Sequence, residues 1–259
     1  MKSVKIGIHT VELYDEIDEL SITRFHKYQK YLLIDSGIGS TMADFDKRIE
    51  KMRRFCILKD TDNAQKEMEN LRQCVYMIQN GLSPQHLAFA TLVIAVDGVQ
   101  CTDITDDGLQ KTLALLADAP VGDLTGNLDS VKKKIDGQLM LYFPKIFEDS
   151  TVKEFYDKMR RRTLLVLKNI VAGVAVDTPE IEQLTSELIT YSHPQTFSGS
   201  NSAEIQFDRQ FENLCIMLSE KLNVNPKQYS VLEFYNAFEF LSEKAKNEQE
   251  AANKARGRH

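Results

Sequence analysis

The chain has 259 residues, of which 42% are hydrophobic and 27% charged, and its formal net charge is -6. This composition is typical of a soluble globular protein, and the length allows one large domain or two smaller ones, each with its own core. Tryptophan is absent, and twelve glycines and six prolines are too few for an all-β or low-complexity chain. The negative charge argues against a general nucleic-acid binder, because phosphate contacts need a basic surface.

Four cysteines are spread along the chain without a CxxC pair. This spacing argues against a zinc site or a thioredoxin-type redox site, and the apolar neighbours favour buried free thiols in a reducing compartment. The four are Cys56, Cys74, Cys101 and Cys215. The N-terminus has no signal-peptide core, and the longest apolar run, Leu87 to Val96, is half of what a bilayer crossing needs. We therefore expect a cytosolic protein without membrane contact.

The N-terminal region combines a short extended segment with a helix. Val4 to His9 alternates in polarity and predicts a strand or an extended arm, whereas the acidic stretch from Glu12 to Glu19 predicts a loop. Ser21 then caps a helix that continues to Asp35. This helix stops at Ser36-Gly37-Ile38-Gly39, where the two glycines permit a positive φ.

Two further helices follow, each with apolar residues on one side. Ser40 caps the first, whose apolar residues recur alternately three and four positions apart and predict a coiled-coil-like seam. The seam consists of Met42, Phe45, Ile49, Met52 and Cys56. The second helix carries an apolar face from Met68 to Ile78 and ends at Asn80-Gly81.

The middle of the chain contains the predicted β element. Ser83-Pro84 starts a helix, with serine at the N-cap and proline at the first helical position. Asp97-Gly98 lies between apolar residues and predicts the two-residue turn of a β-hairpin. Thr105 or Asp106 caps the next helix. Residues 121–125 are predicted as a loop and 128–141 as a helix.

The clearest helical periodicity begins at Ser150 or Thr151, with an apolar face from Val152 to Ile170. Basic residues cover part of the opposite face, and they are Lys158, Arg160, Arg161 and Arg162. A solvated face, partly paired with Glu154 and Asp157, is the default interpretation. Contact with phosphates or with an acidic partner is the functional alternative.

The last part of the chain is again helical. Thr178-Pro179 opens a helix that ends at His193-Pro194, and the segment 193–202, rich in Ser and Gly, is the best linker in the chain. Helices at 203–222 and 231–254 follow. The fold class is therefore mainly α: a multi-helix array with one small β-hairpin and a C-terminal helical hairpin. The predicted domains are a helical body over 1–192 with a short extended arm, the linker at 193–202, and the hairpin with a basic tail at 203–259.

Candidate chemical sites each have a simpler explanation. Asp103 to Gly108 lacks the bidentate glutamate of a calcium loop and fits helix capping better. Cys74 and His86 are close in sequence, but no third group and no oxyanion site accompany them. The glycines at 36–39 lack the Lys-Ser/Thr ending of a P-loop. The sequence thus predicts no catalytic residue, no metal site and no cofactor.

The C-terminal helix changes character along its length. Its first turns carry an apolar and largely aromatic stripe at helical spacing, which fits either a core or a partner groove. The stripe consists of Val231, Phe234, Tyr235, Phe238 and Leu241. Beyond Leu241 the apolar face stops although the composition stays helix-forming. We therefore predict an interaction element, with the stripe as its partner-binding site.

Two stretches resemble known proteins. Residues 25–40, FHKYQKYLLIDSGIGS, followed by Asp44-Phe45-Asp46, look like the opening of structural or assembly proteins of tailed bacteriophages. Residues 230–241, SVLEFYNAFEFL, running into the Glu/Lys/Ala-rich helix, are similar to the C-termini of phage tail assembly chaperones that act beside the tape measure. This resemblance implies no catalytic residues.

We therefore expect a non-enzymatic phage structural or tail-assembly protein that acts through helix-mediated protein–protein contacts. Its partners would be other phage structural or tail proteins, in a homo-oligomer or a hetero-complex, in the host cytoplasm during assembly or in the virion. The alternative is a helical adaptor or regulatory protein that binds nucleic acid through Arg160-Arg161-Arg162 and the basic tail. An enzyme ranks third.

Overall fold

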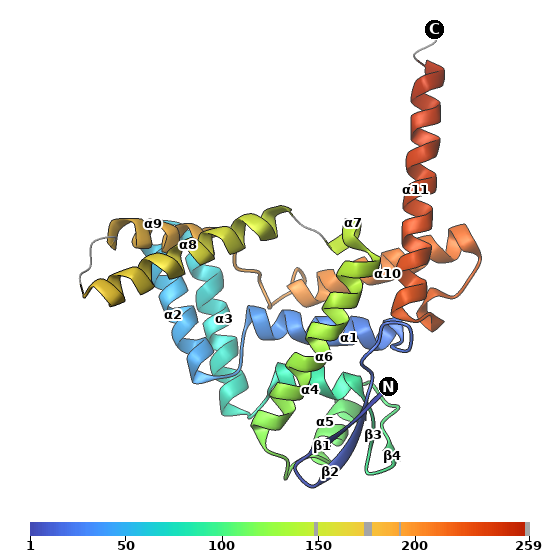
Figure 1. Ribbon diagram of the computed structural model, residues 1–259, viewed down its shortest axis with the longest axis horizontal. Coiled ribbons are helices and arrows are strands. Elements are labelled where there is room, and N and C mark those ends of the chain that lie inside the picture. The colour runs from blue at the N-terminus through green and yellow to red at the C-terminus, as the bar shows by residue number, and fades with distance from the viewer. Residues whose placement is uncertain (148–149, 174–177, 192, 257–259) are drawn as a thin grey trace. The chain divides into compact units, whose positions relative to one another are not determined.

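The computed structural model describes residues 1–147, 150–173, 178–191 and 193–256 (Figure 1). This part of the chain contains eleven α-helices, one 3-10 helix and a small four-stranded antiparallel sheet. The predicted mainly α fold is confirmed. No helix in the described ranges has an apolar stretch long enough to cross a bilayer.

The chain divides into two compact units, and the division differs from the predicted one. Unit 1 comprises Met1–Leu33, Pro84–Phe143 and Glu204–His259, and unit 2 comprises Ile34–Ser83 and Pro144–Ala203. The predicted boundary near residue 192 is therefore wrong. Contacts between segments far apart in the sequence define each unit, and local composition carries no signal of such contacts.

Unit 1 contains the sheet, whose strand order is β1-β2-β3-β4. The strands are β1 (Lys2–Ile6), β2 (His9–Leu13), β3 (Val93–Val96) and β4 (Val99–Gln100). The predicted turn at Asp97-Gly98 joins β3 to β4, with φ of 49° and 82° at its two residues. Assigning the stretch from Glu12 onward to a loop was wrong in part: the interior strand β2 ends at Leu13, with Val11 and Leu13 fully buried.

Unit 1 also contains helices, and α4 packs against both α5 and α6. They are α1 (Ile22–Gly37), which continues into unit 2, α4 (Pro84–Leu92), α5 (Asp106–Ala114), α6 (Val121–Tyr142), α10 (Ala203–Leu222), the 3-10 helix η1 (Pro226–Gln228) and α11 (Val231–Arg256). The predicted loop at 121–125 is the first turn of α6. The apolar face of α6 explains this, because its buried residues at helical spacing begin inside that segment. They are Leu124, Leu128, Val131, Ile135 and Leu139.

Unit 2 consists of helices. They are α2 (Met42–Ile57), α3 (Thr61–Gln79), α7 (Pro144–Phe147), α8 (Ser150–Ala172) and α9 (Thr178–Tyr191). Helices α2 and α3 pack against each other, and α9 contacts both α2 and α8. Helix α8 is therefore an outer helix of unit 2 that packs through α9.

The packed faces of α2 and α3 are more polar than predicted. Met42 is 61% exposed, Ile49 is 38% exposed and Cys56 is exposed, so the predicted seam is not the buried face. Arg48 and Phe55 are buried instead, about a quarter turn away around the helix. Apolar spacing did not identify this face because an arginine occupies its centre.

The segment 193–202 is part of unit 2 and is not a free linker. Asn70 Nδ2 donates to the carbonyl of Gln195 at 2.9 Å, and Asn63 Nδ2 lies 3.0 Å from His193 Nδ1. Phe197 is only 7% exposed, and its ring lies where a Cβ on Gly37 would be. The polar composition predicts a linker, but Asn70 of α3 binds the backbone of the segment, Asn63 of α3 contacts the His193 ring, and the buried Phe197 ring fixes its other end.

Candidate interaction surfaces

The beginning of α11 is fixed to the rest of unit 1 by backbone hydrogen bonds. Val231 N–H donates to the carbonyl of Leu20 at 2.9 Å, and Leu232 N–H donates to the carbonyl of Ile17 at 2.9 Å. Ser230 and Glu233 form a reciprocal capping box, with N–H to oxygen distances of 2.9 and 3.2 Å. The sequence Ser-x-x-Glu encodes this cap and sets where α11 starts.

Most of the predicted partner-binding stripe belongs to the core of unit 1. Val231 is 0% exposed and Phe234 is 2% exposed. Tyr235 contacts Phe25 edge-on at a centroid distance of 6.4 Å and Phe143 at 5.5 Å, and burial raises the pKa of Tyr235 to about 12. The proposal of these three as partner contacts is therefore wrong. Apolar spacing identified a buried face but could not show that the same chain covers it.

The second half of α11 has a different environment. Phe238 and Leu241 are partly buried, and every side chain from Ser242 to Ala251 is exposed. In Figure 1 this half extends away from the remainder of unit 1. The prediction that the distal turns do not pack on the chain's own core is confirmed for residues 242–251.

One exposed aromatic residue lies where α11 leaves unit 1. Phe240 is 59% exposed, and it lies about 120° around the helix from Phe234, on the side away from the buried stripe. The surface around it is a shallow hollow, and we call it the Phe240 face. It consists of Phe240, Glu243, Lys244, Asn247, Glu248 and Ala251. A large aromatic residue off the apolar stripe is the sequence signal for this face, and the predicted partner-binding stripe does not include Phe240.

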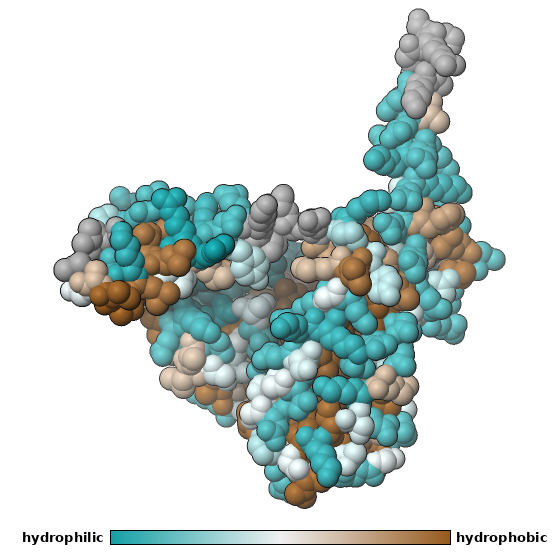
Figure 2. All heavy atoms as spheres, viewed as in Figure 1, coloured by the Kyte–Doolittle hydropathy of each residue, from teal (hydrophilic) through white to brown (hydrophobic). Residues whose placement is uncertain are grey.

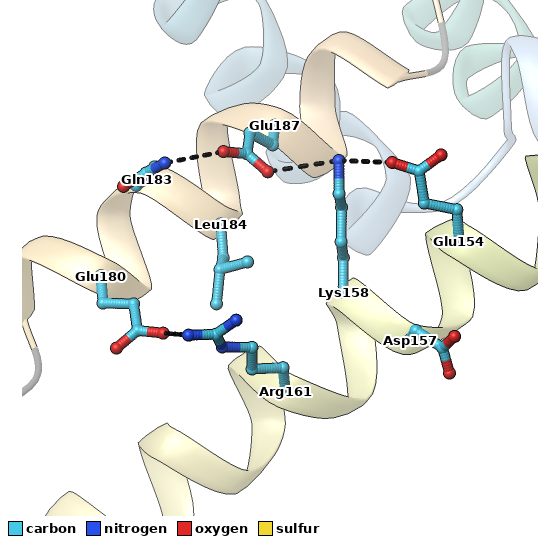
Figure 3. Close-up of a pocket in the computed structure, with 8 residues that line it drawn as sticks. All are labelled: Glu154, Asp157, Lys158, Arg161, Glu180, Gln183, Leu184 and Glu187. Carbon is cyan, nitrogen blue, oxygen red and sulfur yellow. Dashed lines mark hydrogen bonds and ion pairs between the residues drawn. The ribbon is translucent and has the colours of Figure 1, made fainter.

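The basic residues of α8 lie mainly against α9 (Figure 3). Lys158 Nζ lies 3.0 Å from Glu154 and 3.3 Å from Glu187, and these two carboxylates raise the pKa of the lysine. Arg161 pairs with Glu180. The expected i, i+4 pairing of Lys158 with Glu154 is confirmed. The second partner of Lys158, Glu187 on α9, could not be predicted from sequence spacing.

Arg162 and Arg160 differ in their surroundings. Arg162 Nε donates to Thr185 Oγ1 at 2.7 Å, so this guanidinium also contacts α9. Arg160 is exposed and forms no ion pair or hydrogen bond with the described residues. The four basic residues therefore do not form one exposed cluster. This arrangement disfavours the predicted contact with phosphates or an acidic partner through Lys158, Arg161 and Arg162.

Between α8 and α9 there is a cavity of about 400 Å³. Figure 3 shows its lining residues, which are Glu154, Asp157, Lys158, Arg161, Glu180, Gln183, Leu184 and Glu187. Four carboxylates face two cations, and both cations are already paired. The cavity is thus acidic in balance, which opposes an anionic ligand.

The other candidate sites have structural roles. Asp103 accepts hydrogen bonds from Thr105 N–H at 2.9 Å and Thr105 Oγ1 at 2.7 Å, and Thr105 caps α5 through Gly108 N–H. Burial raises the pKa of the Cys74 thiol, which disfavours a nucleophilic thiolate. All four cysteines are free. Cys74, Cys101 and Cys215 are buried as expected, whereas Cys56 is exposed. Within the described ranges, no three metal-binding side chains gather as a metal site requires.

Comparisons with known proteins identified no relative. No protein-family model matches the chain, and neither a curated protein nor a solved structure matches it.

Proposed function

We propose that this protein is a non-enzymatic assembly protein of a tailed bacteriophage that binds other tail or virion proteins through helix surfaces. The main support is the second half of α11, which continues as a helix from Ser242 to Ala251 with every side chain exposed. The two stretches that resemble phage assembly proteins support the phage context.

The exposed half of α11 is energetically unusual. A helix that lacks an apolar face gains little from packing, and isolated helices of this length are marginal in water. Its first turns are stabilised because Val231 and Phe234 are buried in unit 1. The remaining turns gain stability when a partner groove covers them, and because this half has no apolar face, the apolar part of that contact depends on Phe240.

The Phe240 face provides the contact that such a groove requires. A single aromatic anchor surrounded by polar residues is typical of an interface hot spot. Glu243 and Glu248 lie on either side of Lys244 and Asn247, so the rim is mixed in charge. Phe240 inserts into an apolar pocket of the partner, and the charged rim determines the register.

Binding to purified tail proteins tests this proposal. The full chain is titrated with the tape-measure and tail-tube proteins of the phage that the proposal implies, and affinity is measured by calorimetry. Phe240→Ala should weaken binding at least tenfold, the scale expected for a hot-spot residue. Ile216→Ala is the matched control, because Ile216 is 54% exposed on α10 of the same unit. Equal affinity of Phe240→Ala and the intact chain would contradict the proposal, as would absence of binding to any tail protein.

A further inference from the structure

Two asparagines on one face of α3 hold the irregular segment 193–202. Asn63 and Asn70 lie seven residues apart, so they are about 10 Å apart along the helix axis, and they are only 9% and 1% exposed. Asn70 Nδ2 donates to the carbonyl of Gln195 at 2.9 Å, and Asn63 Nδ2 lies 3.0 Å from His193 Nδ1. Because an amide nitrogen only donates, the imidazole nitrogen accepts in this pair. Helix α3 thus binds the segment partly through its backbone, as it would bind a peptide.

An aromatic ring fixes the segment where α1 ends. Phe197 is 7% exposed, and its ring occupies the space that a Cβ on Gly37 would fill. Gly37 is the last residue of α1 and has no positive φ, unlike Gly39. The missing side chain of Gly37 therefore makes room for the ring and is not needed for a turn. We call the surface formed by Asn63, Asn70 and Gly37 the α3 site.

The segment leaves one polar atom of the α3 site without a partner. Asn70 Oδ1 is buried and accepts no hydrogen bond from the described residues. A buried acceptor without a donor weakens an association by roughly tenfold to a hundredfold. The amide of asparagine carries both a donor and an acceptor, so it can pair with the C=O and the N–H groups of an extended backbone. An occupant that supplies an N–H to Asn70 Oδ1 would match the site better than residues 193–202 do.

We propose that the α3 site binds an extended segment of a partner protein that carries an aromatic side chain, and that this segment displaces residues 193–202. The contacts within the chain define the ligand. Asn70 binds a backbone carbonyl, which any sequence provides, and the space beside Gly37 accepts a flat ring. A second copy of this chain is a poorer occupant, because its 193–202 segment leaves the Asn70 oxygen unpaired in the same way. That segment is also bound already by its own copy, at an effective concentration in the millimolar range.

The α3 site is separate from the Phe240 face. All its residues belong to unit 2, whereas α11 belongs to unit 1. Figure 2 shows mainly hydrophilic residues over the second half of α11, which presents a helix to its partner. The α3 site instead receives an extended backbone. The site can therefore be tested without any tail protein, and its failure would leave the proposal for α11 unaffected.

Peptide binding to the full chain tests the α3 site. The probe is a fluorescein-labelled peptide of residues 193–202, and its anisotropy reports binding. Phe197→Ala vacates the ring position, and this chain should bind the peptide with a dissociation constant below about 1 mM, since a tethered segment stays bound at millimolar effective concentration. Gly37→Ala also expels the ring, but its Cβ fills the vacated space, so this chain should not bind the peptide. Tyr76→Ala is the matched control on α3, because Tyr76 is 54% exposed, and it should behave like the intact chain.

Two further measurements test the amide and the displacement. Adding Asn70→Leu to the Phe197→Ala chain should weaken peptide binding at least tenfold. In the intact chain, about 5 mM unlabelled peptide should compete with the tethered segment and accelerate amide hydrogen exchange over residues 193–203. The amide of Ala203 reports this displacement, because it donates to the carbonyl of Thr196 at 2.7 Å.

The outcomes separate exchange from a fixed structural role. Circular dichroism checks the helix content of each variant, and Phe197→Leu, which keeps an apolar side chain, is measured in parallel with Phe197→Ala. Absence of peptide binding to both Phe197 variants would overturn the proposal, as would equal binding by Gly37→Ala. Unchanged hydrogen exchange in the intact chain would show that residues 193–202 are a fixed part of the fold. A concentration-dependent dimer of Phe197→Ala in sedimentation equilibrium would show that a second copy supplies the segment, which contradicts a separate partner protein.

Discussion

Arg48 and Glu67 form a salt bridge inside unit 2, with Arg48 Nη1 3.0 Å from Glu67 Oε2 and both side chains buried. Arg48 also donates through Nε to the carbonyl of Ile38 at 2.5 Å, and through Nη2 to the carbonyl of Ser36 at 3.0 Å. Lys51 Nζ lies 3.0 Å from the second carboxylate oxygen of Glu67. This network joins α2 and α3 to the last turn of α1 and to the residue that follows α1.

Removing one member of this network should destabilise unit 2. Glu67→Gln leaves the Arg48 charge buried without a counter-ion, and breaking a buried pair in this way costs about 3–5 kcal/mol. Urea unfolding followed by circular dichroism measures the change. Lys47→Met is the control, since the Lys47 side chain is 78% exposed and its loss should change stability by less than ~0.5 kcal/mol. A Glu67→Gln protein as stable as the intact chain would show that the pair does not hold α2 and α3 together.

The two sides of α11 should respond differently to truncation of their aromatic residues. Phe234 is 2% exposed, and Phe234→Ala should lower the free energy of unfolding by about 3–5 kcal/mol. Phe240 is 59% exposed, and Phe240→Ala should change it by less than ~0.5 kcal/mol. Chemical denaturation of both variants checks this, and a large loss of stability in Phe240→Ala would mean that Phe240 packs within the chain.

Deleting residues 243–259 should leave unit 1 folded and weaken binding of tail proteins, because it removes every residue of the Phe240 face except Phe240 itself. The described side chains at Glu243 to Ala251 are exposed, so their loss removes little packing. Differential scanning calorimetry should show an unfolding midpoint within a few degrees of the intact chain. A deletion that starts at Phe238 serves as the contrast, because it also removes the partly buried Phe238 and Leu241 and should lower the midpoint clearly. Retained affinity for tail proteins in the shorter deletion would place the binding site elsewhere.

Acid should destabilise unit 1 partly through His26. The His26 imidazole stacks on Phe207 and Phe211 at centroid distances of 4.6 and 4.1 Å. Burial lowers the pKa of His26 below its usual 6.5, whereas the hydrogen bond to Asp208, 2.9 Å from Nε2, acts to raise it. Lys30, 2.6 Å from Asp208, also disfavours protonation of His26. The native state therefore binds fewer protons than the unfolded state, and stability falls as the pH drops below about 6.5.

Unfolding of the intact chain and of His26→Gln, measured at pH 7.5 and 5.5, tests this linkage. The difference in unfolding free energy between the two pH values should be smaller in His26→Gln. His86 serves as an internal control, because burial lowers its pKa too and both proteins retain it. An unchanged pH dependence would show that His26 does not contribute.

Duplex DNA should bind weakly or not at all. Lys158 and Arg161 are paired with carboxylates of α8 and α9, and the net charge of the chain is -6. Because the described basic residues of α8 form no exposed cluster, few counterions are released on binding to this helix. Residues 257–259 of the basic tail lie outside the described part of the chain. An electrophoretic shift with steep salt dependence would favour the nucleic-acid alternative, and Arg160→Ser would then show whether the exposed arginine is responsible.

The sequence by itself determined most of the helices and the hairpin turn. Capping residues such as Thr105 and Ser230, and the Asp97-Gly98 turn, act on neighbouring backbone groups, so a few adjacent residues contain all the necessary information. The exposed end of α11 could also be predicted, because loss of an apolar face is a local property of the sequence.

The tertiary structure alone decided which faces are buried and which segments belong together. Burial of Arg48 depends on Glu67, nineteen positions away in the chain, and the place of the 193–202 segment depends on amides of α3. Likewise, Val231 and Phe234 are apolar at helical spacing whether they meet the chain's own core or a partner. Apolar residues at helical spacing indicate that one face of a helix is buried. Only packing between residues far apart in the sequence decides which surface covers that face.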